Sequence, residues 1–296
     1  MYDIIIIGAG TAGMTAALYA GRAGKSVLVI EKESVGGQII YSPRVENYPG
    51  IRSISGADYA VGLYEQACAL GAEFLFDEVV SLKDNGEDKT VTAGQKEYKS
   101  KSVIIASGVR HRHLGIEFLG EGVSYCAVCD GAFYKGKAVA VAGGGNTALS
   151  DALFLSNICK KVYLIHRRDT FRGEKKSVEI LSKKENVEFV LESNITALNG
   201  ADTLSGVTVK NNKTGIETAL AVNCLFVAVG QEPSNAVFAS VTALDESGFI
   251  IASENCKTSA SGIFAAGDCR TKDVRQLTTA AADGAISAIA ACNYSE

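Results

Sequence analysis

The sequence predicts an α/β protein of two domains with parallel sheets, the second domain inserted into the first. Three observations predict it. A strand, a glycine-rich turn and a helix follow one another twice, the spacing to the next strand is the same in both copies, and each copy later closes with an apolar strand that ends at a glycine. The length of 296 residues fits two domains of ordinary size.

The first copy occupies the N-terminus. A strand over residues 3–7 runs into the turn Gly8–Gly13, and the next strand, over 26–30, ends at Glu31. An apolar strand over 102–107 closes this copy.

The second copy repeats the pattern. A strand over 137–142 runs into the turn Gly143–Ala148, the next strand, over 162–165, ends at His166, and a strand over 224–229 closes the copy. The first glycine and the strand-end residue are equally far apart in both copies, from 8 to 31 and from 143 to 166. The copies are therefore two βαβ units, and we expect β-rich inserts between their helical and closing parts.

A third segment follows the second copy. Residues 262–268 read as a strand that ends at a turn, and an alanine-rich helix is expected over 277–292. This segment has no glycine fingerprint, so we expect it to complete the first domain. The predicted domains are residues 1–112 with 241–296, and the inserted residues 113–240.

Both glycine turns have the form of a nucleotide-binding turn. In such a turn the first glycine allows a tight bend, the second lets a pyrophosphate approach the backbone, and the third lets the helix pack on the sheet. The helix N-terminus supplies free N–H groups and a positive dipole end. A turn that only packs a helix on a sheet is the alternative, but strand, helix and strand-end residue all stand where binding requires them. We therefore expect two Rossmann-like dinucleotide-binding domains of three layers (ββα).

The two copies differ where nucleotide specificity is set. Glu31 can accept hydrogen bonds from ribose hydroxyls, which suits an adenosine without a 2′-phosphate, as in FAD or NAD. The second copy offers His166, Arg167, Arg168 and Arg172 instead. Because arginine forks fit a phosphate, this site is expected to prefer NADPH over NADH. The alternative is a solvated basic patch on the surface. In a chain with a net charge of −4, however, three arginines within six residues beside a glycine turn favour a phosphate site.

An FAD-type site and an NADPH-type site together imply hydride transfer from nicotinamide to flavin. The pair Cys126 and Cys129 indicates the next electron acceptor. A zinc site would need a second ligand pair, and two core thiols are the other alternative. Redox chemistry is favoured because one thiol can leave a mixed disulfide while the other resolves it. Asp130 follows the pair and can move protons or cap a turn.

The position of the cysteine pair has a mechanical consequence. The pair precedes the second glycine turn, so it belongs to the NADPH domain rather than the flavin domain. One face of a flavin cannot contact nicotinamide and disulfide at once. We therefore expect the two domains to rotate between half-reactions.

Composition and charge exclude several classes of protein. With 47% hydrophobic and 21% charged residues, the chain is not disordered. A pI near 5.6 argues against a nucleic-acid or anionic-membrane partner. The N-terminus passes directly into a strand, and no apolar run approaches the length that spans a bilayer. We expect a cytoplasmic protein in which the scattered cysteines are inert buried thiols.

The whole chain resembles the low-molecular-weight thioredoxin reductases of bacteria. The matching motifs run nearly end to end: the two glycine turns, Gly36–Gln38, Val45–Gly50, Tyr125–Gly131, His166–Arg172, Ala265–Asp268 and Arg275-Gln276. The resemblance implies a homodimer that binds FAD and NADPH and reduces thioredoxin. The stretch 109–122 looks shorter than is usual for the family, with His111 and His113 expected as exposed hinge residues.

The resemblance also implies residue roles. Cys129 would face the flavin and take its electrons, Cys126 would attack the thioredoxin disulfide, and Asp130 would act as general acid–base. The residues by themselves do not say which cysteine plays which part. The expected FAD residues are Gly8, Gly10, Thr11, Gly13, Glu31, Lys32, Gly37, Gln38, Asn47, Gly108, Gly267, Asp268, Arg275 and Gln276. The expected NADPH residues are Gly143, Gly145, Asn146, Thr147, Ala148, His166, Arg167, Arg168 and Arg172.

Three other functions remain as alternatives. A flavin reductase that serves ferredoxin or flavodoxin would have no use for the two cysteines. A ferredoxin-fed thioredoxin reductase would have no use for the arginine cluster, and a flavin-binding scaffold or redox sensor would need neither. The acceptor could also be a glutaredoxin- or peroxiredoxin-like protein, because a docking surface has no short motif.

Overall fold

The computed structural model describes residues 1–295, which form two compact units. Unit 1 comprises Met1–Arg110 and the chain from Glu232 onward, and unit 2 comprises His111–Gln231. Residues 232–240, which the sequence pattern assigns to the inserted domain, thus pack with unit 1.

Buried contacts of two residues explain this difference. The side-chain amide of Asn235, which is fully buried, donates to the carbonyl oxygens of Gly248 and Cys269 and accepts from the Ser107 hydroxyl. The Phe238 side chain lies in a hydrophobic core of unit 1. These contacts depend on the tertiary fold, so the local sequence could not place the boundary.

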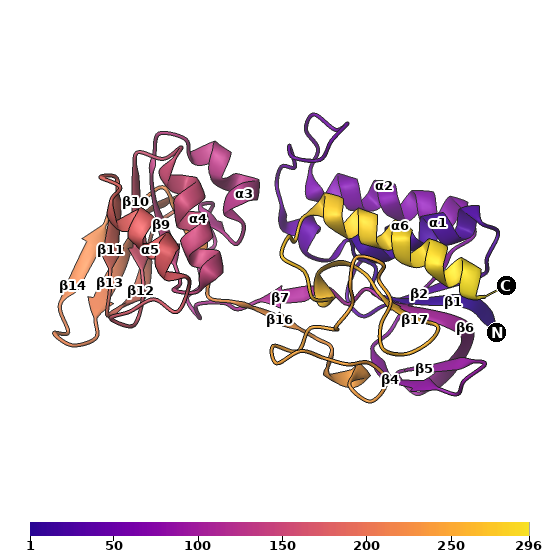
Figure 1. Cartoon of the computed structure of the whole chain (residues 1–296). Helices are drawn as coiled ribbons and strands as arrows, with labels where there is room; N and C mark the ends of the chain where they lie inside the picture. The colour runs from indigo at the N-terminus through magenta and orange to yellow at the C-terminus, as the bar shows by residue number, and fades with distance from the viewer. Residues whose placement is uncertain (296) are drawn as a thin grey trace. The chain divides into compact units, whose positions relative to one another are not determined.

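Unit 1 is built on a seven-stranded sheet (Figure 1). Its strands are β1 (Tyr2–Ile7), β2 (Val27–Glu31), β3 (Glu73–Phe76), β4 (Val79–Asp84), β5 (Lys89–Ala93), β6 (Lys96–Ile105) and β17 (Ile263–Ala265). The order is β3-β2-β1-β6-β5-β4, and β17 pairs with the end of β6. Strands β4 and β5 are antiparallel to their neighbours, and the other pairs are parallel. The third segment therefore completes the first sheet, as expected.

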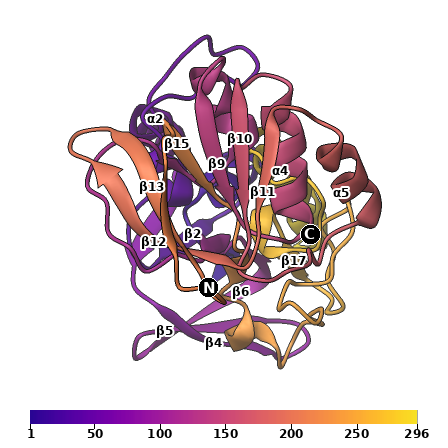
Figure 2. The same ribbon diagram turned by 90° about the vertical axis from the view of Figure 1, so that its left-hand side faces the viewer.

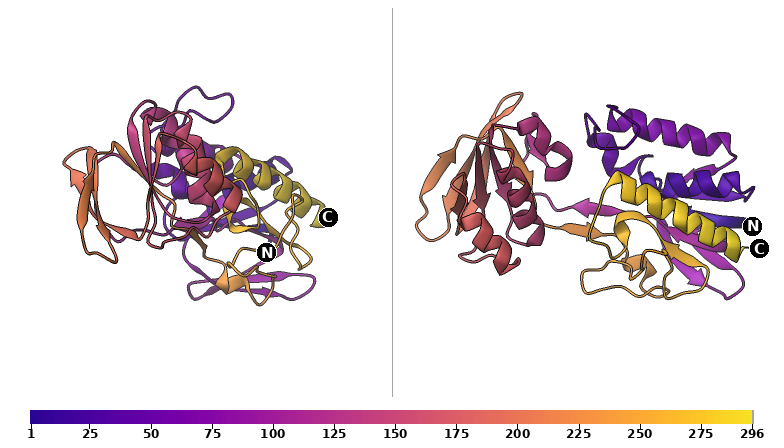
Figure 3. Two further views of the ribbon diagram at one scale, coloured as in Figure 1. Left: turned by 60° about the vertical axis from the view of Figure 1, so that its left-hand side comes forward. Right: turned by 45° about the horizontal axis from the view of Figure 1, so that its top comes forward.

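Three helices lie side by side on one face of this sheet (Figures 1 and 3). They are α1 (Thr11–Arg22), α2 (Gly56–Ala69) and α6 (Leu277–Tyr294), and short 3-10 helices occur at η1 (Gly37–Tyr41), η3 (Ala236–Phe238) and η4 (Gly267–Cys269). The isoleucine run of β1 serves two cores, because successive side chains of a strand point to opposite faces. Ile4 and Ile6 pack towards the helices, whereas Ile5 and Ile7 pack on the other face. Burying each such side chain contributes about 1.5–3 kcal/mol.

Unit 2 repeats this design with a five-stranded parallel sheet of order β11-β10-β9-β15-β8. Its strands are β8 (Val123–Ser124), β9 (Ala138–Ala142), β10 (Lys161–Ile165), β11 (Val187–Val190) and β15 (Cys224–Val227). An antiparallel sheet of β12 (Ser193–Gly200), β13 (Leu204–Asn211) and β14 (Glu217–Leu220) covers one face. The helices α4 (Asn146–Ser156) and α5 (Lys175–Ser182) lie on the other (Figure 2).

Two short strands connect the units. β7 (Val109–His111) and β16 (Gln231–Pro233) pair with each other in a two-stranded sheet. Among the described residues, no helix has both the length and the apolar character needed to cross a membrane.

Candidate active site

The first glycine turn lies between β1 and α1, at the carboxyl end of the parallel strands. Gly8 has a φ of 105°, and a Cβ there would lie 2.4 Å from the carbonyl oxygen of Ala106. A Cβ on Gly13 would lie 1.9 Å from the carbonyl oxygen of Gly8. Gly10, the N-cap of α1, has no side-chain cap, and a Cβ there would meet nothing within 4 Å. Two glycines close the turn on the sheet, and the third leaves the helix N-terminus at Thr11 accessible to a phosphate.

Glu31 ends β2 and points back to this turn. One carboxylate oxygen accepts a hydrogen bond from the backbone N–H of Ala9 at 2.7 Å, and the other accepts one from Glu33 at 2.8 Å. Each oxygen keeps a lone pair for a further donor such as a ribose hydroxyl. Lys32 is directed elsewhere, since its Nζ forms an exposed ion pair with Glu78 at 2.8 Å.

The segment at Gly36 lies against the same turn. The Gly36 N–H donates to the carbonyl oxygen of Ala9 at 2.7 Å, and Gly36 forms a β-bridge with Gly10. A Cβ on Gly37 would lie 3.6 Å from the Cα of Gly10. Gly37 and Gln38, which begin η1, are thereby placed beside the helix N-terminus.

Two expected residues from distant parts of the chain meet at the start of α6. The Asn47 side-chain amide donates to Oε1 of Gln276 at 3.2 Å, although 229 positions separate them. Gln276 is the N-cap of α6 and belongs to a capping box with Thr279. Arg275 Nε donates to the carbonyl oxygen of Asp268 at 3.4 Å. These contacts bring the C-terminal motifs to the part of unit 1 that carries the first glycine turn.

The turn at Gly267 also borders α1. Gly267 has a φ of 80°, and a Cβ there would lie 2.8 Å from the Cβ of Ala12. Burial raises the pKa of the neighbouring Asp268. Gly108, with a φ of 63°, follows β6, the strand beside β1 and β17. The expected FAD residues therefore all lie in unit 1, and most line the carboxyl ends of its central strands.

The second glycine turn joins β9 to α4. Gly143 has a φ of 154°, and a Cβ there would lie 2.3 Å from the carbonyl oxygen of the residue after β15. Gly145 is the N-cap of α4, without a side-chain cap, and a Cβ there would meet nothing within 4 Å. Asn146 and Thr147 form the first turn of α4 on its exposed side, and Ala148 is buried under it. The second turn thus has the geometry of the first, with Ala148 in place of the third glycine.

The arginine cluster is attached to this turn through its backbone. The Arg172 N–H donates to the carbonyl oxygen of Gly144 at 2.7 Å. Arg167, Arg168 and Arg172 are exposed, and none forms an ion pair within the described part of the chain. Three exposed guanidinium groups after the second strand of a βαβ unit fit the 2′-phosphate of a nucleotide.

His166 lies between the cluster and the turn. Its side chain is 5% exposed and stacks on Phe171, with ring centroids 5.5 Å apart. A Cβ on Gly144 would lie 2.2 Å from the imidazole, so only glycine permits this packing. Burial lowers the pKa of His166, which therefore presents a neutral ring at pH 7.

Three buried side-chain polar atoms have no hydrogen-bond partner within residues 1–295: the Tyr59 hydroxyl, Asp268 Oδ1 and His166 Nε2. Each belongs to a residue beside one of the two glycine turns. Because proteins satisfy nearly all buried polar groups, these atoms indicate where a polar ligand belongs. The residues present thus fit one dinucleotide in each unit.

The expected cysteine pair forms a disulfide, Cys126–Cys129, with Cα atoms 5.3 Å apart. It lies on α3 (Ala127–Asp130), and the Cys129 N–H donates to Sγ of Cys126 at 3.2 Å. Val128, between the cysteines, is 53% exposed, and the two cysteines are partly buried. Within the described residues, no group of three or more His, Cys, Asp or Glu side chains is placed to hold a metal ion. Of the remaining cysteines Cys68 is exposed, contrary to expectation.

Asp130 is held beside the pair by a residue that the sequence did not indicate. The Ser124 hydroxyl donates to Oδ2 of Asp130 at 2.6 Å and accepts the Cys126 N–H at 3.1 Å. Burial raises the pKa of Asp130 and the hydrogen bond from Ser124 lowers it, with burial prevailing. A carboxyl group that holds its proton closer to neutral pH is suited to acid–base work.

The two hinge histidines both contact Tyr125, the residue before the pair. His113 Nδ1 lies 2.7 Å from the Tyr125 hydroxyl, and the His111 ring lies 4.8 Å from the Tyr125 ring. His113 is exposed as expected, but His111 is half-buried, and burial lowers its pKa. Both positions serve the packing of Tyr125.

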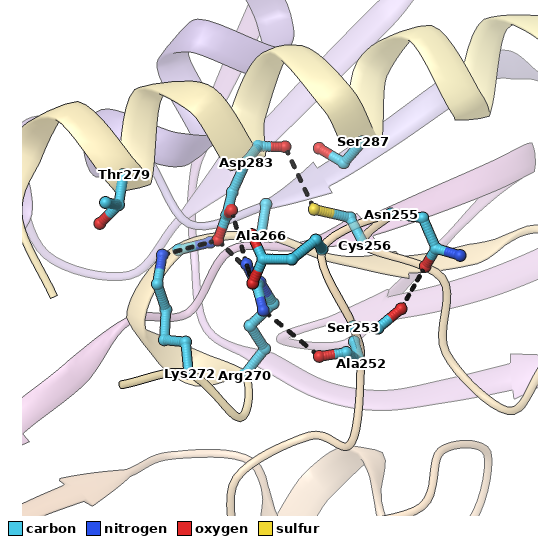
Figure 4. Close-up of polar contacts among 12 residues, drawn as sticks. Ala252, Ser253, Asn255, Cys256, Ala266, Arg270, Lys272, Thr279, Asp283 and Ser287 are labelled. Atoms are coloured by element: carbon cyan, nitrogen blue, oxygen red, sulfur yellow. Dashed lines mark hydrogen bonds and ion pairs between the residues drawn. The ribbon is translucent and has the colours of Figure 1, made fainter. Parts of the chain in front are cut away.

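A buried ionic cluster supports the Gly267 turn (Figure 4). Asp283 on α6 accepts hydrogen bonds from Arg270 Nε and NH2, both at 2.8 Å, and from Lys272 Nζ at 2.9 Å. It also accepts the Gly267 N–H at 2.9 Å. One carboxylate thus fixes the turn that carries Asp268. No local sequence pattern connects Asp283 with Arg270, Lys272 and Gly267, so the sequence did not predict this cluster.

Comparison with known proteins identifies the family. The model of the pyridine nucleotide-disulphide oxidoreductases matches residues 2–284. The thioredoxin reductase of Listeria innocua is 41% identical, with 100% of this chain and 94% of that protein covered. That of Treponema pallidum is 42% identical, with 99% and 97% covered. The crystal structure of thioredoxin reductase from Streptococcus pyogenes superposes with a TM-score of 0.95 at 40% identity, covering 99% of this chain and 98% of that one. The chain therefore belongs to the pyridine nucleotide-disulphide oxidoreductase family.

Proposed function

We propose that this chain uses NADPH to reduce the disulfide of thioredoxin, with FAD bound in unit 1. The observation that carries the proposal is the Cys126–Cys129 disulfide beside Asp130, in the unit that holds the second glycine turn. The curated relatives cited above, which align over nearly their whole length, are named thioredoxin reductases. Family membership implies a flavin and a nicotinamide nucleotide, and the residues at the two turns support FAD and NADPH as the specific ones.

The nucleotide assignments rest on charge. Glu31 presents carboxylate oxygens at the first turn, which favours unmodified ribose hydroxyls and hence FAD. The three exposed arginines near the second turn favour a 2′-phosphate and hence NADPH. When bound, the two nucleotides supply hydride transfer from nicotinamide to flavin and two electrons to a disulfide.

The side chains of unit 2 then carry out thiol–disulfide exchange. Two electrons and two protons convert the Cys126–Cys129 disulfide to two thiols. The thiolate of Cys126 attacks one sulfur of the thioredoxin disulfide, and the other sulfur leaves and takes a proton. The thiolate of Cys129 then attacks Cys126, which re-forms the internal disulfide and releases dithiol thioredoxin. Asp130, with a raised pKa, gives and takes the protons.

The remaining parts of the proposal follow from motif order and from the family. The disulfide and the NADPH residues belong to one unit and the FAD residues to the other, so rotation about β7 and β16 between half-reactions is proposed. The working form is a cytoplasmic homodimer without nucleic-acid or membrane partners.

An anaerobic titration of the purified protein tests the proposal. NADPH should bleach the flavin absorbance rapidly, NADH poorly, and thioredoxin should then restore the oxidised spectrum. If neither nucleotide bleaches the flavin, a ferredoxin-fed reductase becomes the better reading. If NADPH bleaches it but only a glutaredoxin- or peroxiredoxin-like protein restores it, the thioredoxin assignment fails.

A further inference from the structure

One of the three unpartnered buried atoms belongs to a residue that neither motif nor family resemblance singled out. Tyr59 lies in the first half of α2, and its side chain is 6% exposed. Its hydroxyl makes no hydrogen bond of acceptable geometry within the described residues. The side chains of Tyr48 and Thr11 are close enough to affect its pKa, but neither satisfies the hydroxyl. An unpaired buried hydroxyl lowers the stability of the fold. A phenylalanine would fill nearly the same volume without that cost.

The surroundings of this hydroxyl belong to the first glycine turn. Thr11 is the first residue of α1, is 6% exposed, and follows the uncapped N-cap Gly10. The residue after Tyr59, Ala60, packs against Gly36, since a Cβ on Gly36 would lie 2.6 Å from the Ala60 Cβ. Gly36 in turn bridges Gly10. The beginning of α2 is therefore fixed beside the N-terminus of α1, and the Tyr59 hydroxyl lies near the side chain of Thr11 at that N-terminus.

The protonation state of the Tyr59 phenol indicates which kind of ligand atom it can bind. Burial raises the pKa of Tyr59 well above its ordinary value, so the phenol keeps its proton and acts as a donor. The backbone N–H groups at the start of α1 are donors as well. A ligand atom that several donors share must be an acceptor, and the helix dipole favours a negative one.

We propose that the Tyr59 hydroxyl donates a hydrogen bond to a phosphate oxygen of the dinucleotide held at the N-terminus of α1. Tyr59 is thereby a further cofactor-binding residue of unit 1. This inference rests on the proposed flavin site and adds a side-chain donor to the backbone donors of the glycine turn.

The test compares Tyr59→Phe with the unchanged protein and with Tyr64→Phe, a matched change on the same helix. The full chain is purified with its flavin, and the dissociation constant of FAD is obtained from the rise in flavin fluorescence on dilution. Binding of ADP, which keeps the diphosphate but lacks the flavin, is measured on flavin-free protein by calorimetry. The melting temperature of the flavin-free protein is the structural control.

Tyr59→Phe should weaken FAD and ADP by a similar factor of about ten or more, the loss expected for a hydrogen bond to a charged acceptor. The melting temperature of the flavin-free variant should be unchanged or higher, because an unpaired buried hydroxyl is removed. Tyr64→Phe should change neither constant.

Three results would overturn the inference. Unchanged FAD affinity would show that the hydroxyl does not reach the ligand, and a loss confined to FAD would move it from the phosphate to the flavin half. A lower melting temperature of the flavin-free variant with unchanged affinity would give Tyr59 a purely structural part. Failure of the unchanged protein to bind FAD would instead refute the proposed function.

Discussion

The hydroxyl of Ser124 donates a 2.6 Å hydrogen bond to Oδ2 of Asp130. The Ser124 hydroxyl oxygen also accepts a hydrogen bond from the backbone N–H of Cys126, so one side chain connects the Asp130 carboxyl group to the cysteine that we propose attacks thioredoxin. Burial raises the pKa of Asp130, and this hydrogen bond partly offsets the effect. The serine thus affects both the position and the acidity of the carboxyl group that we propose as the general acid–base.

Ser124→Ala should raise the pKa of Asp130 further, because the lowering contribution is lost while burial remains. Asp130 then keeps its proton to higher pH, and the alkaline limb of the pH profile of thioredoxin reduction should move upward. We also expect kcat to fall by about tenfold as the carboxyl loses its orientation. Ser193→Ala, which removes a buried hydroxyl bonded to the Leu191 carbonyl, is the control. A lower rate with an unmoved alkaline limb would limit Ser124 to a structural part.

Replacing either Cys126 or Cys129 by serine should abolish turnover of thioredoxin, since thiol–disulfide exchange needs both sulfurs. Reduction of the flavin by NADPH should persist, because it precedes the disulfide step. Stopped-flow absorbance and a thioredoxin-coupled assay measure the two steps separately. Cys68→Ser, at an exposed cysteine of unit 1, should leave both rates unchanged. Disulfide turnover that survives in either active-site variant would refute the dithiol mechanism.

The double change Arg167→Ala and Arg168→Ala should raise the KM for NADPH by roughly 10–100-fold, the cost of losing charged hydrogen bonds to a phosphate. The KM for NADH, which lacks the 2′-phosphate, should change little. Lys183→Ala removes an exposed positive charge elsewhere in unit 2 and serves as the charge control. If both nucleotides lose affinity equally, the cluster does not recognise the 2′-phosphate.

Glu31→Ala should weaken FAD binding by at least about tenfold, because ribose hydroxyls lose a charged acceptor and the Ala9 N–H loses its partner. The measurement is the flavin content after extended dialysis. Glu33→Ala, in which an exposed carboxylate paired with Arg110 is removed, should retain its flavin. Full occupancy in the Glu31 variant would contradict its role in ribose recognition.

Features of the fold that depend on local chemistry were predictable from the sequence. The glycine turns were predictable because Gly8 and Gly13 occupy positions where any Cβ would overlap backbone atoms. The contact of Asn47 with Gln276 required knowledge of the family, since no local pattern joins them. Ser124 and Tyr59 had no signal at all. A serine two residues before a cysteine and a tyrosine within a helix are common in proteins. Only the tertiary structure shows what surrounds the hydroxyls of Ser124 and Tyr59.

Asp283→Asn should destabilise unit 1 and change its response to acid. Burial alone would raise the pKa of Asp283, but hydrogen bonds from Arg270 and Lys272 outweigh it and hold the pKa below 3.8. Since the folded-state pKa is the lower one, the carboxylate stabilises the fold above about pH 4, and this contribution disappears as the pH falls through the folded-state pKa.

Leaving Arg270 and Lys272 without their shared partner should cost about 3 kcal/mol at pH 7. Urea unfolding followed by circular dichroism at pH 7 and at a series of pH values from 4 down to about 2.5 measures both effects. Below pH 4 the variant should lose less stability than the unchanged protein, because it has no carboxylate to protonate. Glu188→Gln, which breaks an exposed ion pair with Lys161, should cost less than about 1 kcal/mol. Equal losses in the two variants would mean that burial of the Asp283 cluster contributes nothing to the fold.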